Sequence, residues 1–315
     1  MKNFNSAVVV GASGFVGTHL CNALAETGME KVSKIDIESA MPVDIRKPFD
    51  IDGDFGENTV IFNLAATHRT PGHPDREYFE TNMLGAKNLC DFAAKHGINT
   101  IIFTSSISPY GTSEEPKTEE TLPMPDTPYG ISKLAAEYIH REWAASSPEH
   151  FLSIARPGIV FGKGETGNMT RLYKALKSRR FAYAGRKDTI KASIYVKDLA
   201  RILLEMARNP RERVQTYNCT YFPAPNIEQI VQTMNNVTGL NRFVPYIPQT
   251  PLMIIAFFAG MLGGLGLGIC PERVRKLMIS SNVSGEKLSR DYPLRFSLEE
   301  AFTDWFNDCG LRGLE

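Results

Sequence analysis

A short apolar run followed at once by evenly spaced glycines is the feature that most constrains the fold of this chain. Residues 7–10 are Ala-Val-Val-Val, which is typical of a buried parallel strand. Gly11, Gly14 and Gly17 follow, and residues 18–26 have the pattern of a helix. A strand, a glycine turn and a helix in this order place a pyrophosphate on the N–H groups of the helix N-terminus. We therefore expect a phosphate-binding turn, with an ordinary glycine turn as the alternative.

Strand-like runs alternate with helical segments along most of the chain. The predicted strands are residues 7–10, 32–37, 59–64, 100–103, 151–155 and 214–219. This alternation predicts an α/β fold with a Rossmann-type, doubly wound parallel sheet. Ligands of such sheets bind at the carboxyl ends of the strands.

The length of 315 residues allows one large domain or two ordinary ones. We expect an NAD(P)-binding Rossmann domain and a smaller C-terminal substrate-binding domain. The first would comprise residues 1–165 and 190–222, and the second residues 223–315 with a contribution from 166–189.

Asp36 lies in the second predicted strand, 25 residues after Gly11. A carboxylate near this spacing meets the adenosine ribose hydroxyls and would repel a 2′-phosphate, which favours NAD over NADP. The alternative is a solvated aspartate at a strand end. Only seven residues separate Asp36 from Asp44, and these are too few for a normal crossover helix.

Tyr129 and Lys133 lie four residues apart in a segment that begins Thr127-Pro128 and is predicted to be helical. The two side chains would share one helix face. A lysine ammonium one turn away favours the phenolate and lowers the pKa of the tyrosine, which makes the pair a proton-transfer device. An ordinary surface helix is the alternative.

Composition narrows the possible partners and locations. The 35 basic residues balance the 35 acidic ones, so charge gives no reason to expect a nucleic acid partner. The five cysteines have no paired spacing, which predicts a reducing compartment with neither a disulfide framework nor a zinc or other metal site. The N-terminal apolar run is too short for a signal peptide. We expect a cytoplasmic protein.

Residues 163–191 are basic, and two interpretations remain open. The segment is either a solvated helix face or a pocket wall for an anionic substrate. The residues that define it are Asn168, Arg171, Lys174, Arg179, Arg180 and Arg186.

Residues 251–270 contain no charged residue and include five glycines. The stretch is long enough to span a bilayer, but its glycines disfavour a continuous helix. We expect a buried helix and loop of the substrate-binding domain. Peripheral membrane contact and a lining for an apolar ligand are the alternatives.

Eight motifs occur in an order that resembles the extended short-chain dehydrogenase/reductase superfamily, and in particular its NAD-dependent epimerase/dehydratase family of nucleotide-sugar enzymes. The resemblance covers residues 7 to about 200. The motifs are GASGFVG, KIDI, NLAA, TNMLG, TSSISPYG, PYGISK, RPGIVFG and IYVKDLA.

The resemblance implies roles for individual residues. Tyr129 would be the catalytic acid/base, Lys133 its partner and Ser106 a hydrogen-bond donor to the reacting sugar oxygen. Ser106, Asn168 and Lys191 would contact the substrate, the last two at its diphosphate. The residues implied in cofactor binding are Gly11, Ser13, Gly14, Phe15, Val16, Asp36, Asp44, Ile45, Leu64, Ala65, Ala66, Thr104, Tyr129, Lys133 and Pro157.

The resemblance also implies an activity. The first expectation is an NAD-dependent UDP-hexose 4-epimerase that acts through a 4-keto intermediate. The alternatives are an NAD(P)H-dependent nucleotide-4-keto-sugar reductase, which the short link after Asp36 resembles, a 3β-hydroxysteroid-type dehydrogenase, and a non-enzymatic dinucleotide sensor. Ile107-Ser108 stands where family dehydratases carry Asp-Glu, which argues against water elimination. The resemblance further implies a homodimer that pairs the helices around residues 78–95 and 129–143.

Overall fold

A computed structural model describes residues 2–38, 42–68, 72–251, 253 and 278–314. Most of the apolar stretch 251–270 lies outside the described residues, so its predicted place in the substrate-binding domain stays a prediction. Within the described parts of the chain, no helix is both long enough and apolar enough to cross a membrane.

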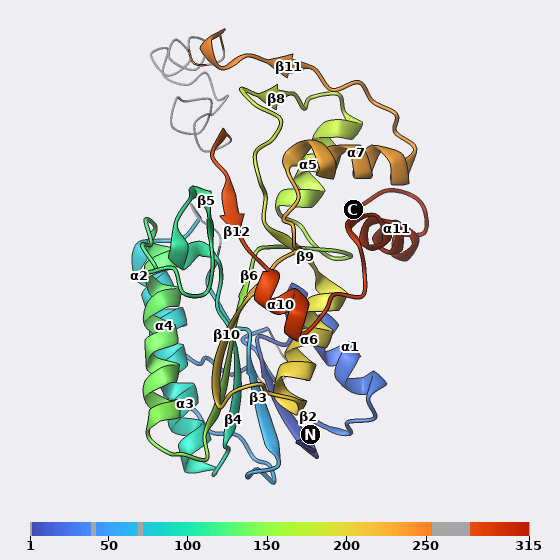
Figure 1. The fold of residues 1–315 in the computed structure, drawn as a ribbon. Helices are drawn as coiled ribbons and strands as arrows, with labels where there is room; N and C mark the ends of the chain where they lie inside the picture. Colours follow the sequence, from blue (N-terminus) through green and yellow to red (C-terminus); the bar gives the residue numbers. More distant parts are fainter. Residues whose placement is uncertain (1, 39–41, 69–71, 252, 254–277, 315) are drawn as a thin grey trace.

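A six-stranded parallel sheet forms the centre of the molecule (Figure 1). Its strand order is β10-β6-β4-β3-β1-β2, so the chain leaves β1 toward one edge of the sheet and returns as β3 on the other side of β1. The carboxyl ends of β1 and β3 therefore flank the point where the strand order reverses, which is where ligands of such sheets bind. The strands are β1 (Ser6–Val10), β2 (Lys31–Ile35), β3 (Thr59–Asn63), β4 (Thr100–Thr104), β6 (Phe151–Pro157) and β10 (Val214–Cys219).

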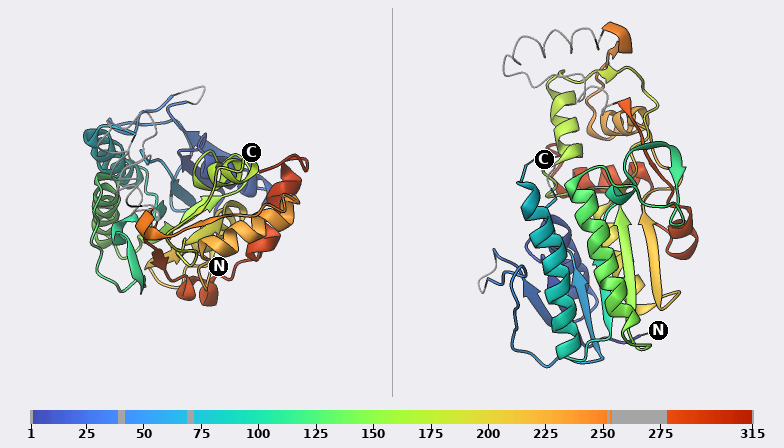
Figure 2. Two further views of the ribbon diagram at one scale, coloured as in Figure 1. Left: turned by 90° about the horizontal axis from the view of Figure 1, so that it is seen from above. Right: turned by 90° about the vertical axis from the view of Figure 1, so that its left-hand side faces the viewer.

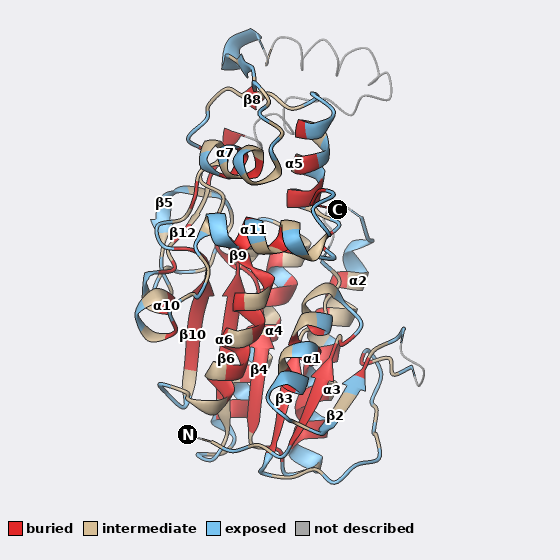
Figure 3. Ribbon diagram, turned by 90° about the vertical axis from the view of Figure 1, so that its right-hand side faces the viewer, coloured by how far each residue is buried: buried red, intermediate tan, exposed pale blue. Residues whose placement is uncertain are grey.

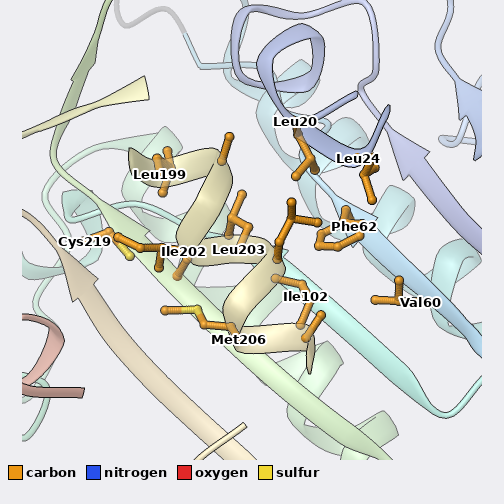
Figure 4. Close-up of a cluster of buried hydrophobic side chains, with 14 of the residues drawn as sticks. Leu20, Leu24, Val60, Phe62, Ile102, Leu199, Ile202, Leu203, Met206 and Cys219 are labelled. Carbon is orange, nitrogen blue, oxygen red and sulfur yellow. The ribbon is translucent and has the colours of Figure 1, made fainter. Parts of the chain in front are cut away.

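Helices cover both faces of the sheet, and its strands other than the edge strand β2 are almost continuously buried (Figure 3). α1 (Phe15–Glu26) and α6 (Val196–Arg208) pack together on one face. Figure 4 shows Leu20 and Leu24 of α1 meeting Leu203 of α6 above the side chains of the central strands. α3 (Gly85–Lys95) and α4 (Pro128–Ala145) lie side by side on the other face (Figure 2). Burial on both faces explains why the strands are apolar runs rather than alternating ones.

A second group of elements gathers beyond the carboxyl edge of the sheet. Its core is aromatic and includes the fully buried Phe161, Phe302 and Trp305. Reciprocal side-chain hydrogen bonds cap the start of α7 and the start of α11, as capping boxes do. The helices and strands of this group are β7 (Ile159–Phe161), α5 (Asn168–Lys177), β8 (Tyr183–Ala184), β9 (Ser193–Tyr195), α7 (Ile227–Thr238), β11 (Tyr246–Ile247) and α11 (Leu298–Asp308).

Smaller elements connect these two groups. β5 pairs with β12, and α10 lies against β10. Their bounds, with those of the short helices before α3 and α4, are α2 (Asp75–Phe79), the π-helix η1 (Glu80–Leu84), the 3-10 helix η2 (Ser108–Tyr110), β5 (Ser113–Lys117), β12 (Ser281–Val283) and α10 (Glu286–Asp291).

The structure confirms the predicted α/β class and each of the six predicted strands to within two residues at either end. The described residues between β2 and β3 form no helix, as the short link after Asp36 predicts. The division into an NAD(P)-binding and a substrate-binding domain at the boundaries given above stays a prediction.

Gly17 offers a test of how closely α1 approaches the glycine turn. A Cβ at this position would lie 2.1 Å from the carbonyl oxygen of Gly11, so Gly17→Ala forces the helix away from the turn. We expect a loss of about 1–3 kcal/mol in the free energy of unfolding, measured by urea denaturation. Gly56→Ala is the control, because its Cβ would meet no atom within 4 Å. Equal stability of the two variants would contradict this close packing.

Candidate active site

The reversal point of the sheet brings two strand ends into backbone contact. A Cβ on Gly11 would lie 2.8 Å from the amide nitrogen of Ala65, and Gly11 has φ +81°. The amide of Leu64 donates to the carbonyl of Val10 at 2.9 Å. Only a glycine satisfies both the positive φ and this close approach. Leu64, Ala65 and Ala66 remain partly exposed, so this part of the predicted cofactor site lies at the surface of the carboxyl edge.

The turn before α1 has the features of an anion site. Gly14 occupies the N-cap position without any side-chain cap, and the first helical turn carries no acidic residue. The N–H groups of that turn are therefore available to a phosphate. Asp36 reaches the same turn, because the amide of Ser13 donates to its Oδ2 at 2.9 Å. Val16 packs against the core between the sheet and the helices α1 and α6, and Phe15 packs against the aromatic core beyond the sheet. These contacts hold the start of the helix in place.

The side chains of Asp44 and Ile45 are less available to a cofactor than the resemblance implies. The carboxylate of Asp44 forms a two-pronged ion pair with Arg46, with both N···O distances at 2.8 Å, and this pairing lowers the pKa of Asp44. Ile45 is buried, and its Cδ1 lies 2.6 Å from where a Cβ on Gly85 would be. The Ile45 side chain thus belongs to the core between sheet and helix, which leaves its backbone to border an adenine.

The first turn of α4 is fixed against the loop after β4. The Oγ1 of Thr127 accepts from the amide of Gly130 at 3.1 Å, and Pro128 occupies the first turn, where a missing N–H costs nothing. A Cβ on Gly130 would lie 2.7 Å from the carbonyl oxygen of Ser108. This contact places Tyr129 near Ser106, and the Ser106 hydroxyl acts on the phenol to lower its pKa, against the effect of burial.

Lys133 lies one turn further along α4 and is 1% exposed. Its Nζ donates to the carbonyl oxygen of Thr104 at 2.6 Å and lies 4.4 Å from the centre of the Phe103 ring. The structure thus brings together Ser106, Tyr129, Lys133 and Thr104 at the end of β4. Pro157 ends the adjacent strand, and its carbonyl accepts from the amide of Ile107 at 3.1 Å.

The predicted direction of the Tyr129 pKa shift is wrong. Burial raises the pKa of Tyr129, and the hydrogen bond from Ser106 only partly opposes this. Burial also lowers the pKa of Lys133 to about 7, against the attraction of Glu137. The prediction treated the two groups as a solvated pair on a helix face. Packing that face against the strand ends desolvates both, and desolvation disfavours both charged forms.

A buried charge network that the sequence analysis missed lies directly behind these residues. Glu137 and Arg156 form a two-pronged ion pair with distances of 2.8 and 2.6 Å, and their side chains are 2% and 5% exposed. Ser105 donates to Glu137 at 2.6 Å, and Arg156 also donates to the Tyr110 hydroxyl at 2.6 Å. The only signal in the sequence was a glutamate four residues after Lys133, which is indistinguishable from a surface residue without the fold.

Asn82 ties the neighbouring helix to α4. It lies in the π-helix η1, and its Nδ2 donates to the hydroxyl of Ser132 at 2.8 Å. Its Oδ1 accepts from the amide of Thr67 at 3.2 Å, in the loop that follows β3. Ser132 in turn donates to the carbonyl of Tyr129 at 2.9 Å. The TNMLG motif therefore acts by joining the β3 loop to the helix that carries Tyr129.

The predicted diphosphate contacts lie in separate elements. Asn168 is the first residue of α5, is exposed, and accepts from Arg171 at 3.1 Å. Lys191 donates to the carbonyl of Ile279 at 3.0 Å, and burial lowers its pKa. Arg186 and Glu114, which form an ion pair at 2.9 Å, both act on the charge of Lys191. The structure does not join Asn168 and Lys191 to the Tyr129 group by a hydrogen bond among the described residues.

A Rossmann-type sheet with an anion-binding turn and a Tyr–Lys pair defines a class of nucleotide-dependent oxidoreductase-type enzymes. The model of the NAD dependent epimerase/dehydratase family matches residues 7–220. The chain belongs to this family.

Two curated relatives align with most of the chain. It is 29% identical over 289 residues to an N-acetyl-α-D-glucosaminyl-diphospho-ditrans,octacis-undecaprenol 4-epimerase of Escherichia coli O157:H7, with 90% of this chain and 85% of the relative covered. It is 27% identical over 294 residues to a UDP-glucose 4-epimerase of Azospirillum brasilense, with 79% and 83% covered.

Solved structures share the fold. A UDP-N-acetylglucosamine 4-epimerase from Bacillus cereus has a TM-score of 0.71 at 20% identity and covers 98% of this chain and 99% of its own. A UDP-glucuronic acid 4-epimerase from Bacillus cereus in complex with NAD has a TM-score of 0.72 at 19% identity, with 96% and 99% covered.

The ion pair between Glu137 and Arg156 should behave as a coupled buried unit. Glu137→Gln or Arg156→Met leaves one buried charge without its partner, so we expect each to lower the free energy of unfolding by about 3–5 kcal/mol. The double variant removes both charges and should recover most of the loss. Denaturant unfolding of the four proteins measures the coupling, and additive losses in the double variant would show that the two charges act independently.

Proposed function

We propose that this protein is an NAD-dependent 4-epimerase of a hexose that is joined through a diphosphate to its carrier. The observation that carries the proposal is that Ser106 and Tyr129 lie close together, one helical turn from the buried Lys133, at the edge of the sheet that also carries the phosphate-type turn. A proton-transfer group beside a dinucleotide site suits hydride transfer at a carbon that bears a hydroxyl.

The described residues fit a dinucleotide. The uncapped first turn of α1 would bind the pyrophosphate. Asp36, whose carboxylate accepts a hydrogen bond from the Ser13 amide beside that turn, would accept from the ribose hydroxyls. The charge of Asp36 opposes a 2′-phosphate, so NAD is the proposed form rather than NADP. Bound NAD would accept a hydride from the sugar and return it to the opposite face.

The side chains would move the matching proton. Deprotonated Tyr129 takes the proton of the sugar 4-hydroxyl as the hydride leaves C4, which gives a 4-keto sugar. Burial opposes ionisation of Tyr129, and the Ser106 hydroxyl acts against that effect. Ser106 donates to the same sugar oxygen and holds it in place. Reversal of both transfers from the other face of the ketone gives the 4-epimer.

Two carriers fit this chemistry, because both bind the sugar through a diphosphate. A uridine nucleotide is the first candidate, and the named relative from Azospirillum brasilense supports it. A polyprenol is the second, and the relative from Escherichia coli O157:H7, which aligns with 90% of this chain, supports that one. Asn168 and Lys191 are the proposed diphosphate contacts in either case. A cytoplasmic location belongs to the same proposal.

Cofactor stoichiometry tests the proposal against the reductase alternative. An epimerase regenerates NAD in every cycle, so we expect the protein to purify with NAD and to interconvert a UDP-hexose or polyprenyl-diphosphate hexose with its 4-epimer without added cofactor. Stoichiometric consumption of NADH or NADPH with a 4-keto sugar, and no exchange between 4-epimers, would decide for a reductase.

Tyr129→Phe should lower turnover by about 10²–10⁴, which is the usual contribution of a general acid/base, while NAD remains bound. Tyr138→Phe is the matched control, because it removes a hydroxyl from the same helix at a side chain that is 62% exposed. Turnover of both variants is measured with the sugar that the wild type epimerises. Near wild-type turnover of Tyr129→Phe would remove this residue from the mechanism.

We also propose a homodimer formed through α3 and α4. Leu84, Ile131 and Tyr138 are 48%, 44% and 62% exposed on or next to these adjacent helices, and a partner copy would cover them. We expect a dimer mass in light scattering at micromolar concentration and a monomer for Tyr138→Glu. Phe243→Asp, at another exposed aromatic residue, should stay dimeric. A monomeric wild type would contradict the proposal.

A further inference from the structure

The charges of this chain are distributed unevenly, although they sum to zero. Residues 163–191 contain nine basic and two acidic residues, whereas the whole chain has 35 of each kind. The rest of the protein is therefore net acidic. These basic residues lie on α5 and in the segments next to it in the chain. α5 is at the end of the molecule opposite the N-terminus (Figure 1).

Most of the cations in this segment already have a local role. Arg186 pairs with Asp188 at 2.7 Å and with Glu114 at 2.9 Å, and Lys187 pairs with Glu228 at 3.4 Å. Lys174 and Lys177 lie in the last turn of α5, where positive charge offsets the helix dipole. Arg179 and Arg180 are different, because they lie past the helix end, are exposed, and form no ion pair with any described residue.

Exposed aromatic residues lie in the chain segment that pairs with the strand following these two arginines. β8 and β11 pair in parallel, with Tyr183 opposite Tyr246, and the amide of Tyr183 donates to the carbonyl of Pro245 at 2.9 Å. The chain segment that carries Arg179 and Arg180 therefore runs into β8 next to the segment that carries Phe243 into β11. Phe243 is 91% exposed and Tyr246 is 48% exposed. We call Arg179, Arg180, Phe243 and Tyr246 the distal surface.

We propose that the distal surface docks on an anionic lipid bilayer. Arginines bind lipid phosphates, and aromatic rings insert at the level of the headgroups, so the two residue types together suit a membrane interface. Phe243 lies in the loop between α7 and β11, and shallow insertion would bury its ring, which is almost fully exposed. Nucleic acid fits less well, because the chain as a whole carries no net positive charge.

The proposal rests on the proposed function and decides between its two carriers in favour of the polyprenol. α5 begins at Asn168, the proposed diphosphate contact, and ends two residues before Arg179. Its 10 residues span about 15 Å at the rise of an α-helix. A sugar diphosphate at the start of α5 would then lie about one helix length from the membrane that holds its lipid carrier.

Vesicle sedimentation tests the docking directly. The wild-type protein should pellet with vesicles made of equal parts of phosphatidylglycerol and phosphatidylcholine, weakly with phosphatidylcholine alone, and less at high salt. We expect the double variant Arg179→Glu/Arg180→Glu and the single variant Phe243→Ser each to lower the partition coefficient by about tenfold or more. Lys31→Glu/Arg290→Glu is the matched control, because it reverses two exposed cations outside the distal surface and should bind like the wild type.

Measuring membrane binding and epimerase activity separately distinguishes a failure of the docking proposal from a failure of the proposed function. Wild-type protein that stays in the supernatant, or a distal-surface variant that pellets as well as the wild type, would overturn the proposal; an acidic protein surface would then be the alternative partner. Epimerase activity on a soluble UDP-hexose is measured in parallel, and distal-surface variants should leave it unchanged. With a polyprenyl-diphosphate hexose in vesicles, the same variants should lower kcat/KM by about tenfold, in proportion to the lost binding.

Discussion

The rest of the site depends on the buried ion pair between Glu137 of α4 and Arg156 of β6. Removing two charges from water costs several kcal/mol per ion, and only complete hydrogen bonding offsets that cost. Here both oxygens of Glu137 are used, by Arg156 and by Ser105 after β4. The hydrogen bonds of this ion pair can therefore form at only one position of α4 relative to the strands. Tyr129, Lys133 and Glu137 lie at successive intervals of four residues on that helix, so the position of Glu137 also determines where the phenol and the ammonium lie.

The same burial sets the acid–base character of the site. It raises the pKa of Tyr129 and lowers the pKa of Lys133 to about 7, so both residues favour their neutral forms in the closed interior. A phenol that resists ionisation is a poor base by itself. The attraction of Glu137 opposes the effect of burial on the pKa of Lys133 and so favours the protonated lysine. Glu137 thus connects the mechanical support of α4 with its chemistry, because it also acts on the charge of Lys133.

The sequence allowed the sheet and the helix that carries Tyr129 and Lys133 to be predicted, because both depend on local signals. Buried parallel strands appear as apolar runs, and the spacing of Tyr129 and Lys133 follows from the helix period. The charge network of Glu137, Arg156 and Tyr110 was not predictable in this way, since its members are 19 to 46 residues apart and meet only through the order of the strands. The pKa of Tyr129 was predicted in the wrong direction for a related reason: the pattern reveals a shared helix face but not how completely the strands cover it. Ile45 shows the same limit, because its side chain packs into the core, which the implied place beside the adenine did not reveal.

The match to the family model ends at residue 220, one residue after β10, the last strand of the central sheet. All residues of the Tyr129 group, the anion-binding turn and the charge network described above lie between the start of β1 and the end of β6. α7 and α11, which pack on each other, come after that boundary and share a core with α5. The elements proposed to hold the carrier can therefore diverge without moving the groups proposed to transfer hydride and proton. Evidence for the carrier has to come from α5 and the surface beyond it, because the proposed chemistry at the sheet would be the same for either carrier.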